Sequence, residues 1–291
     1  MNGTPFDRCE NRGYGAFMRR PLISSLLVAA GVLAGAVGLV APAQAMVRGQ
    51  ADPVHKAVGS FWASFNGEAP FFICTGTQVS AEYFVTAGHC VDYVVQYGGQ
   101  AYVSFEQDLD DVSLANLIPA TTILNPRYKE AKGTDLYQFD VSLLHLDSAS
   151  DVPSTDYGKL PTLGQLDGMK AAGTLRQAKF TLSGYGTSSM VVDPTSGHGN
   201  PISFPDTGER LTGTLGFTAL SGSVLHENQR ANAGFAGAGY GDSGGPTFLE
   251  GTNTILGVTS TGDIPCYATN TSYRLDTKDA RDFLGTYLLL P

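Results

Sequence analysis

The stretch Gly241–Pro246, which reads Gly-Asp-Ser-Gly-Gly-Pro, limits this 291-residue chain to two possible folds. Glycines on both sides of Ser243 let the backbone turn sharply, so that a carbonyl group can approach the hydroxyl without meeting a bulky side chain. The same turn can aim the N–H groups of Gly241 and Ser243 at one point, where they would stabilise an oxyanion. Ser243 is therefore a candidate nucleophile for acyl transfer.

The positions of the histidines decide between these two folds. The stretch fits the nucleophile turn of α/β-hydrolases, but in that fold the catalytic histidine follows the serine. The 48 residues after Ser243 contain no histidine. All five histidines precede it: His55, His89, His145, His198 and His226. The sequence therefore favours the unrelated fold in which the order is His, Asp, Ser.

The amino-acid composition favours β-structure. Glycine makes up 36 of the 291 residues, about 12% against a usual ~7%, and 15 prolines and 13 tyrosines accompany it. Apolar and polar residues alternate in short runs, as in 61–65, 71–79 and 83–87, with turn residues between them. With 42% hydrophobic residues, the chain can form a substantial core. We expect an all-β fold.

The beginning of the chain has the pattern of a targeting segment. Two arginines precede a largely apolar run over 22–40, and Ala-Gln-Ala at 43–45 matches the pattern that signal peptidase reads. We therefore expect residues 1–45 to be a cleaved signal peptide, the mature chain to begin at Met46 and the protein to be secreted. An uncleaved membrane anchor is the alternative, because a run of about 19 apolar residues can span a bilayer.

The charge balance excludes one class of partner. Removal of residues 1–45 leaves 14 basic and 25 acidic residues, a net charge of −11. Because phosphate binding needs a basic face, nucleic acid is not expected as a partner. The adjacent carboxylates of the 106–111 loop are interpreted as solvated rather than as a Ca²⁺ site. No P-loop or zinc-spacing motif is present, so neither a metal nor a cofactor is expected.

The cysteines predict one disulfide. Cys9 leaves with the signal peptide, so Cys74, Cys90 and Cys266 remain in the mature chain. Export to an oxidising compartment favours pairing, and Cys74 with Cys90 is the short-range choice on either side of an apolar strand-like segment. Cys266 would then stay a buried thiol or form an intermolecular disulfide.

One histidine and one aspartate stand in surroundings that suit the other catalytic roles. His89 follows the apolar run over 83–87, where small residues leave space beside the imidazole and Cys90 can fix the turn. A general base needs such a fixed orientation. Asp140 enters the apolar run over 139–146, where an unpaired carboxylate is costly to bury. An imidazole N–H would satisfy this carboxylate and would fix the histidine tautomer.

With candidates in the order His, Asp, Ser, the chain resembles the chymotrypsin/trypsin family of secreted serine proteases. The similarity rests on four stretches: Val85–Cys90, Asp140–Leu144, Ser183–Thr187 and Gly241–Pro246. The resemblance implies two antiparallel six-stranded β-barrels with the catalytic triad at their junction. It also implies a short C-terminal helix, which residues 276–284 fit with Asp276 or Thr277 as the N-cap.

The resemblance divides the mature chain into two domains. Residues 46–165 would form the N-terminal barrel, with His89 as the general base and Asp140 as its orienting acid. Residues 166–291 would form the C-terminal barrel and the C-terminal helix, with Ser243 as the nucleophile. The oxyanion hole would be the two N–H groups named above.

One departure from the family concerns the N-terminus. In activated members a new N-terminal amine pairs with the acid that precedes the catalytic serine, here Asp242. We expect signal peptidase to free the amine of Met46, which then docks on Asp242, because an unpaired buried carboxylate would cost roughly 3–5 kcal/mol. A short propeptide removed after Arg48, which leaves Gly49 first, is the alternative.

The resemblance also implies how substrate binds. Ser260, Thr261 and Gly262 correspond to the extended segment that pairs with the substrate backbone by strand addition. The position that carries an acid in trypsin-like members is Gly237, so a preference for Arg or Lys is not implied. Gly262 leaves the pocket entrance open and Thr271 narrows the interior, which favours small or medium apolar side chains.

A family disulfide beside this pocket is missing. Cys266 matches one of its cysteines, but Gly239 occupies the position of the other. The loop that walls the pocket would then be looser or held by packing. Asp263, at the rim of the pocket, would attract a basic residue.

Three functions remain open. The first is a secreted, monomeric serine endopeptidase that cleaves protein or peptide substrates through an acyl-enzyme, with no membrane contact after signal cleavage. The second is a non-catalytic homologue that binds proteins, against which the intact triad argues. The third is an esterase that uses the same triad.

Overall fold

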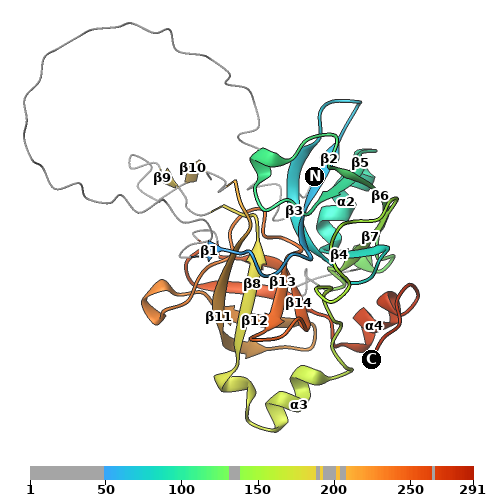
Figure 1. The fold of residues 1–291 in the computed structure, drawn as a ribbon. Helices are drawn as coiled ribbons and strands as arrows, with labels where there is room; N and C mark the ends of the chain where they lie inside the picture. Colours follow the sequence, from blue (N-terminus) through green and yellow to red (C-terminus); the bar gives the residue numbers. More distant parts are fainter. Residues whose placement is uncertain (1–48, 131–137, 188–190, 193–200, 204–207, 264–265) are drawn as a thin grey trace, which may run out of the picture. The chain divides into compact units, whose positions relative to one another are not determined.

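In the computed structural model of the chain, the described residues are 49–130, 138–187, 191–192, 201–203, 208–263 and 266–291 (Figure 1). The expected signal peptide, Met46 and His198 lie outside them. Within this part of the chain, no helix is both long and apolar enough to cross a membrane.

The first barrel is built from six antiparallel strands, coloured from blue to green in Figure 1. Its closed strand order is β2-β3-β4-β7-β6-β5. Alternate side chains such as Phe61, Phe84 and Leu144 fill its interior, as a period of two residues requires. The strands are β2 (Val58–Ser64), β3 (Phe71–Gln78), β4 (Tyr83–Thr86), β5 (Gln100–Ser104), β6 (Ile118–Ile123) and β7 (Ser142–Leu146).

The second barrel also closes through six antiparallel strands, in the order β8-β11-β12-β15-β14-β13, because β11 pairs with β8. The short strand β1 (Gln50–Ala51) adds to β11 outside this ring. The barrel strands are β8 (Lys179–Gly184), β11 (Leu211–Leu220), β12 (Val224–Asn228), β13 (Pro246–Leu249), β14 (Ile255–Gly262) and β15 (Thr269–Arg274). A separate pair, β9 (Val191–Val192) and β10 (Pro201–Ser203), forms a two-stranded sheet. The two closed barrels confirm the expected all-β fold.

Helices occupy little of the described chain. The α-helices are α2 (Gly88–Gln96), α3 (Gln165–Ala171) and α4 (Lys278–Leu284). Single 3₁₀ turns are η1 (Leu109–Asp111), η2 (Tyr128–Glu130), η3 (Leu175–Gln177) and η4 (Ala231–Ala233). The Thr277 hydroxyl accepts a hydrogen bond from the Ala280 N–H at 3.2 Å, so it caps α4 as one of the two expected residues.

Three apolar clusters hold these elements together. One lies inside each barrel, and the third joins the barrels to α4. In this shared core, Val85 and Leu143 of the first barrel lie in one cluster with Val258 of the second barrel and with Phe283 and Leu284 of α4. The C-terminal helix therefore stabilises both halves of the molecule.

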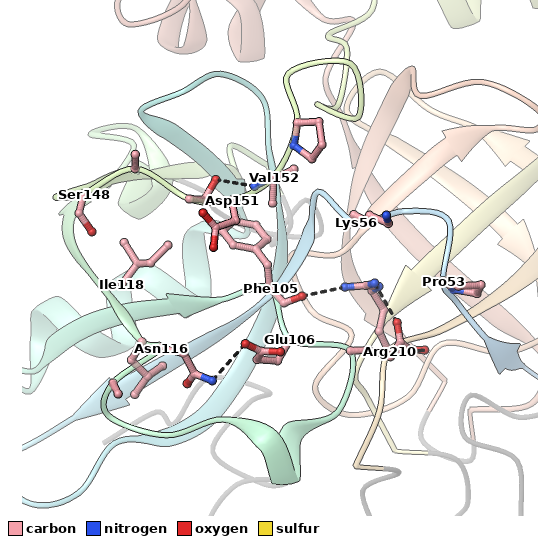
Figure 2. Close-up of a pocket in the computed structure, with 16 residues that line it drawn as sticks. Pro53, Lys56, Phe105, Glu106, Asn116, Ile118, Ser148, Asp151, Val152 and Arg210 are labelled. Carbon is pink, nitrogen blue, oxygen red and sulfur yellow. Dashed lines mark hydrogen bonds between the residues drawn. The ribbon is translucent and has the colours of Figure 1, made fainter.

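A buried arginine adds a polar link between the barrels (Figure 2). Arg210, which directly precedes β11, is only 3% exposed. Its guanidinium donates to the carbonyl oxygens of Asp52, Val58 and Phe105 at 3.1, 3.1 and 3.3 Å. It also donates to the Tyr185 hydroxyl at 3.0 Å. One side chain thereby joins the N-terminal segment, the first barrel and the second barrel.

A surface pocket of about 690 Å³ opens beside this arginine. Charged side chains of Lys56, Glu106 and Asp151 line it together with apolar ones such as Ile118 and Val152 (Figure 2). No side chain that the sequence assigns to catalysis or substrate binding lines this pocket.

One expected element has a different boundary. The apolar pattern over 139–146 predicts one strand over this whole run, but β7 begins only at Ser142. Phe139 has a φ of 64°, in the left-handed region, and so ends the extended conformation on that side. Asp140 therefore lies in a turn before the strand, where its carboxylate can meet partners from other elements.

Candidate active site

The end of β4 and the start of α2 position His89. Ala87 is the N-cap of α2, and His89 is the second residue of the helix. The His89 backbone N–H donates to Oδ1 of Asp140 at 2.8 Å. A disulfide joins Cys90, the next residue, to Cys74 of β3, as the sequence predicted. The first turn of the helix is thus fixed by one covalent bond and one hydrogen bond.

The Asp140 carboxylate also contacts the imidazole. Nδ1 of His89 lies 3.0 Å from Oδ2 and 3.2 Å from Oδ1 of Asp140. The Ser260 hydroxyl donates a hydrogen bond to Oδ2. Burial alone would raise the pKa of Asp140, but the charge and hydrogen bonds of His89, together with Ser260, hold this pKa below its usual value. Asp140 is therefore a carboxylate that holds the proton of the imidazole on Nδ1.

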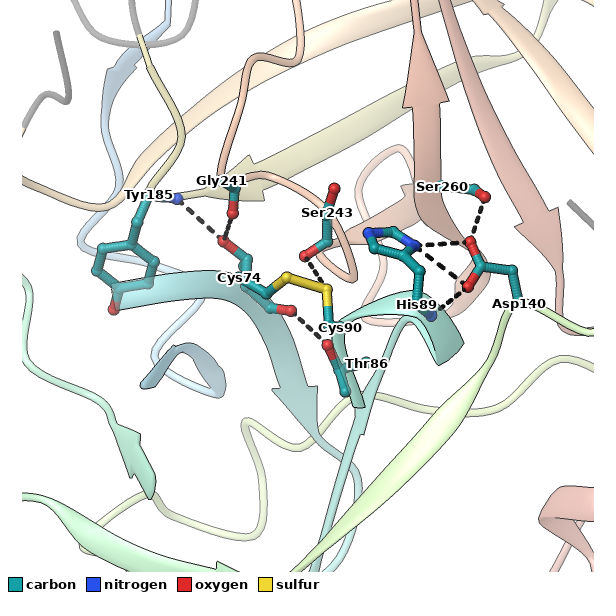
Figure 3. Close-up of a disulfide and its surroundings, with 10 residues drawn as sticks. Cys74, Thr86, His89, Cys90, Asp140, Tyr185, Gly241, Ser243 and Ser260 are labelled. Atoms are coloured by element: carbon teal, nitrogen blue, oxygen red, sulfur yellow. Dashed lines mark hydrogen bonds and ion pairs between the residues drawn. A yellow bond between two sulfur atoms is a disulfide. The ribbon is translucent and has the colours of Figure 1, made fainter. Parts of the chain in front are cut away.

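Ser243 lies on the other side of the same ring. Figure 3 shows the imidazole of His89 between the Asp140 carboxylate and the Ser243 side chain. The Ser243 carbonyl oxygen accepts a hydrogen bond from the Thr75 N–H at 2.9 Å. The Thr75 hydroxyl donates to the carbonyl oxygen of Gly241 at 2.8 Å. Strand β3 of the first barrel therefore holds the serine loop of the second barrel in place.

Two positions of this loop require glycine, because neighbouring atoms leave no space for a Cβ. Gly244 has a φ of 80°, and a Cβ there would lie 2.1 Å from Oγ1 of Thr86 and 2.4 Å from the carbonyl oxygen of Thr75. Gly241 has a φ of 97°, and a Cβ there would lie 2.8 Å from the Phe72 ring. No side chain fits at either position without displacement of its neighbours.

The loop leaves two backbone donors beside the serine. Among the described residues, the N–H groups of Gly241 and Ser243 donate to no protein acceptor. By contrast, Gly244 donates to the carbonyl oxygen of Thr259 at 2.7 Å and Gly245 to that of Asp242 at 2.9 Å. These are the two donors that the sequence assigns to an oxyanion hole, and that role stays a prediction.

Asp242, between these donors, is completely buried. Its carboxylate accepts hydrogen bonds from the backbone N–H of Gly239 at 2.7 Å and from that of Gly186 at 2.9 Å. Burial raises the pKa of Asp242 to about 6, and the two hydrogen bonds lower it only in part. Its expected partner, the amine of Met46, lies outside the described residues, so this pairing stays a prediction.

The residues expected to bind substrate lie on β14, on β15 and in the 236–240 segment. Thr261 and Gly262 stand at the end of β14 and are half-buried and exposed, respectively. Gly237 is buried, and so is Thr271 of β15. Nδ1 of His226 lies 3.1 Å from Oγ1 of Thr271, a contact that the sequence did not suggest.

Two side-chain roles were not foreseen from the sequence. Ser260 was expected to act through its backbone, yet its hydroxyl binds the Asp140 carboxylate. Asp263 was expected to face a basic substrate residue, yet its carboxylate accepts hydrogen bonds from its own loop and from Gln229. No local pattern announces the contact of Ser260 with Asp140 or that of Gln229 with Asp263, because each joins residues far apart in the sequence.

One group of potential metal ligands lies at this site. In the described part of the chain, the group of potential ligand atoms that lie close together belongs to Cys74, His89 and Cys90. Both sulfur atoms are in the disulfide, so neither is a thiolate ligand.

Comparison with protein families accounts for this arrangement. The Trypsin family model matches residues 47–281. The chain belongs to the trypsin family. The match spans both barrels and includes His89, Asp140 and Ser243 in the expected order. No curated protein matches the chain. This trypsin-family protein thus has a serine protease fold, with its candidate triad at the junction of the two barrels.

Proposed function

We propose that this trypsin-family protein is a secreted serine endopeptidase that cleaves protein or peptide substrates through an acyl-enzyme. The observation that carries the proposal is the position of the His89 imidazole between a buried, charged Asp140 and the Ser243 side chain (Figure 3). Two adjacent N–H donors support the same chemistry. Together they supply a nucleophile, a base and an oxyanion site.

The side chains would act in turn. Nε2 of His89 takes the proton of Ser243 Oγ as this oxygen attacks the substrate carbonyl carbon. The N–H groups of Gly241 and Ser243 stabilise the negative oxygen of the tetrahedral intermediate. His89 then gives its proton to the leaving amine, and a water molecule repeats the sequence on the acyl-enzyme. Asp140 keeps the imidazole oriented and stabilises its charged form.

The N-terminal amine of Met46 is proposed to pair with Asp242. A carboxyl with a pKa of about 6 is largely ionised at neutral pH, so it is a buried charge that an ammonium group would stabilise. Release of this amine by signal peptidase would complete the site without a separate activation step. N-terminal sequencing of the secreted protein tests this: a start at Met46 supports it, and a start at Gly49 supports the propeptide alternative.

The pocket beside Ser243 is proposed to accept small or medium apolar side chains. Gly237 contributes no side chain to its wall, and Gly262 leaves the entrance open. Gly237 stands where trypsin-like members carry an acid, so it supplies no carboxylate for a basic side chain, and the nearby Asp263 accepts four hydrogen bonds within the protein.

Cleavage-site profiling of a diverse peptide library tests the proposed activity. The secreted protein is compared with Ser243→Ala, and both are treated with a fluorophosphonate that labels reactive serines. We expect cuts and labelling in the wild type and neither in the variant. Ester hydrolysis without peptide cleavage would favour the esterase. A folded wild type that is neither labelled nor active would favour a non-catalytic binding protein.

A further inference from the structure

The family resemblance places the substrate pocket beside Ser243 between two segments, and one of the two cysteines that would join them is missing. One segment runs over 236–239 and the other follows β14. The position of the missing cysteine is Gly239, where a Cβ would lie 2.3 Å from the carbonyl oxygen of Thr187 and 2.7 Å from its Oγ1. A cysteine does not fit there. The two segments are joined by hydrogen bonds instead.

The side chain of Gln229 reaches both walls. Gln229 directly follows β12 and is fully buried. Its Oε1 accepts a hydrogen bond from the Ala238 N–H at 2.9 Å. Its Nε2 donates to Oδ1 of Asp263 at 3.0 Å. Ala238 is next to Gly237, and Asp263 is next to Gly262, so the amide bridges the neighbours of two pocket residues.

Asp263 is also hydrogen-bonded to the backbone of the loop that follows it. Its carboxylate accepts hydrogen bonds from the backbone N–H groups of Tyr267, Ala268 and Thr269 at 3.0, 2.9 and 2.6 Å. The Gln229 backbone N–H donates to the carbonyl oxygen of Ala268 at 3.1 Å. Burial would raise the pKa of Asp263, but these backbone donors and Gln229 hold it below its usual value. The carboxylate is therefore charged and accepts four hydrogen bonds within the protein.

We infer that Gln229 and Asp263 form a hydrogen-bonded clamp that sets the separation of the two pocket walls, in place of a disulfide. Gln229 is thus a positioning residue for substrate binding, and Asp263 is not a substrate ligand. The inference rests on the proposed function, because it assigns the pocket of that same site. It replaces the expectation of a loop that is loose or held by apolar packing alone.

The clamp has different consequences for different substrates. A peptide must place a side chain between the walls, so its binding depends on their separation. A small ester such as p-nitrophenyl acetate needs only the triad and the oxyanion donors. Loosening the walls therefore raises KM for peptides while hydrolysis of the small ester stays unchanged.

Two substitutions break the clamp from opposite ends. Gln229→Glu keeps the acceptor for Ala238 but turns the donor into an oxygen that faces the Asp263 carboxylate. Asp263→Ala removes the acceptor at a half-buried position. Asp108→Ala is the matched control, because Asp108 likewise caps its own turn, through the Asp110 N–H at 3.0 Å.

We expect each clamp variant to lower kcat/KM for a peptide chosen from the cleavage profile about 10-fold, mainly through KM. Hydrolysis of p-nitrophenyl acetate and fluorophosphonate labelling should stay within about twofold of wild type. The control should change neither activity. Equal losses for peptide and ester, or no loss in a folded variant, would overturn the inference.

Amide hydrogen exchange tests the clamp independently of activity. In both variants, exchange should become faster at the amides of Tyr267, Ala268 and Thr269, and the control should leave them unchanged. Unchanged exchange in the clamp variants would overturn the inference even if the wild type proved inactive. An inactive wild type with faster exchange in the variants would contradict the proposed function alone.

Discussion

Asp140 keeps its charge because every hydrogen bond that reaches its carboxylate favours the ionised form. The His89 backbone N–H, the His89 imidazole and the Ser260 hydroxyl all donate to it. Burial opposes ionisation, yet the pKa of Asp140 remains below its usual value. The contacts with His89 that stabilise this charge also hold the imidazole in place. The orientation of His89 and the ionisation of Asp140 therefore depend on the same hydrogen bonds.

The Asp140→Asn substitution removes the negative charge of the side chain but keeps its shape, so it tests the role of the charge. The amide is nearly isosteric, but it no longer holds the imidazole proton on Nδ1, so Nε2 cannot accept the Ser243 proton. We expect kcat for peptide cleavage to fall about 10⁴-fold, measured by steady-state kinetics. The thermal unfolding midpoint serves as the control for folding. A folded variant that loses less than tenfold would contradict the assigned role.

The three candidate catalytic residues could be predicted from the sequence, whereas the residues that hold the site in place could not. His89, Asp140 and Ser243 lie in distinctive local stretches whose order along the chain excludes the other fold. Ser260 reaches Asp140 across 120 sequence positions, and Gln229 reaches Asp263 across 34. Such contacts depend on the closed barrel, and a serine or glutamine carries no local signal of its distant partner.

Strand β3 supports both halves of the candidate site. Cys74 of this strand is bonded to Cys90 of α2, and the next residue, Thr75, holds the carbonyl oxygens of Ser243 and Gly241. The base and the nucleophile come from different barrels, yet both are anchored to neighbouring positions of one strand. Movement of β3 would therefore displace His89 and Ser243 together.

Removal of the disulfide should destabilise the whole chain. Cys74 and Cys90 are separated by 16 positions, and closing a loop of this size constrains the unfolded state by about 3 kcal/mol. We expect urea denaturation of the Cys74→Ala/Cys90→Ala variant to give a free energy of unfolding lower than that of wild type by about this amount, with a midpoint at lower urea concentration. Reduced wild type should match the variant, and dithiothreitol should leave the variant unchanged. Equal stability of oxidised wild type and variant would contradict this.

Helix and strand boundaries can be predicted from the sequence where the contacts that determine them are local. The cap of α4 lies within three residues of its partner, Thr277 with Ala280, so the sequence contains the whole signal. The start of β7 depends on Phe139, whose ring lies under the Arg127 guanidinium at 3.9 Å, and on the contact of Asp140 with α2. Tertiary contacts outweighed the apolar pattern there.

At the scale of the whole molecule, the barrels are joined by an apolar core and by Arg210. Replacement of this side chain by an apolar one would remove the donor to the carbonyl oxygens of Asp52 and Phe105 and to the Gln107 side-chain oxygen, while the Val58 carbonyl oxygen would keep the Tyr185 hydroxyl at 3.4 Å. Each lost partner costs about 1 kcal/mol or more. The hydrogen bonds of Arg210 therefore stabilise both barrels.

Arg210→Met should lower the free energy of unfolding by about 3 kcal/mol, measured by urea denaturation. Arg176→Met, at an exposed position, is the control and should change it by less than about 0.5 kcal/mol. Two separate unfolding transitions in the Arg210 variant would indicate that the barrels have become independent. A variant as stable as the control would contradict the assigned link.

The second barrel buries an acid that makes its stability depend on pH. Glu227 of β12 is fully buried, and its carboxyl meets the Thr247 hydroxyl at 3.0 Å and the Asn270 amide at 3.4 Å. Burial raises the pKa of Glu227 to about 8, against an ordinary value of 4.5. At neutral pH the folded protein therefore keeps a proton that the unfolded chain releases.

Because the folded-state pKa of Glu227 is raised, its contribution is fully present below about pH 4.5 and is lost as the pH rises toward 8. Linkage gives about 1.4 kcal/mol per pH unit, on the order of 5 kcal/mol over this window. Glu227→Gln keeps the shape without ionising, so we expect its urea stability relative to wild type to increase from pH 5 to pH 9. Glu250→Gln, at an exposed position, should show no such trend. A constant difference between Glu227→Gln and wild type across this range would mean that Glu227 ionises normally in the folded barrel.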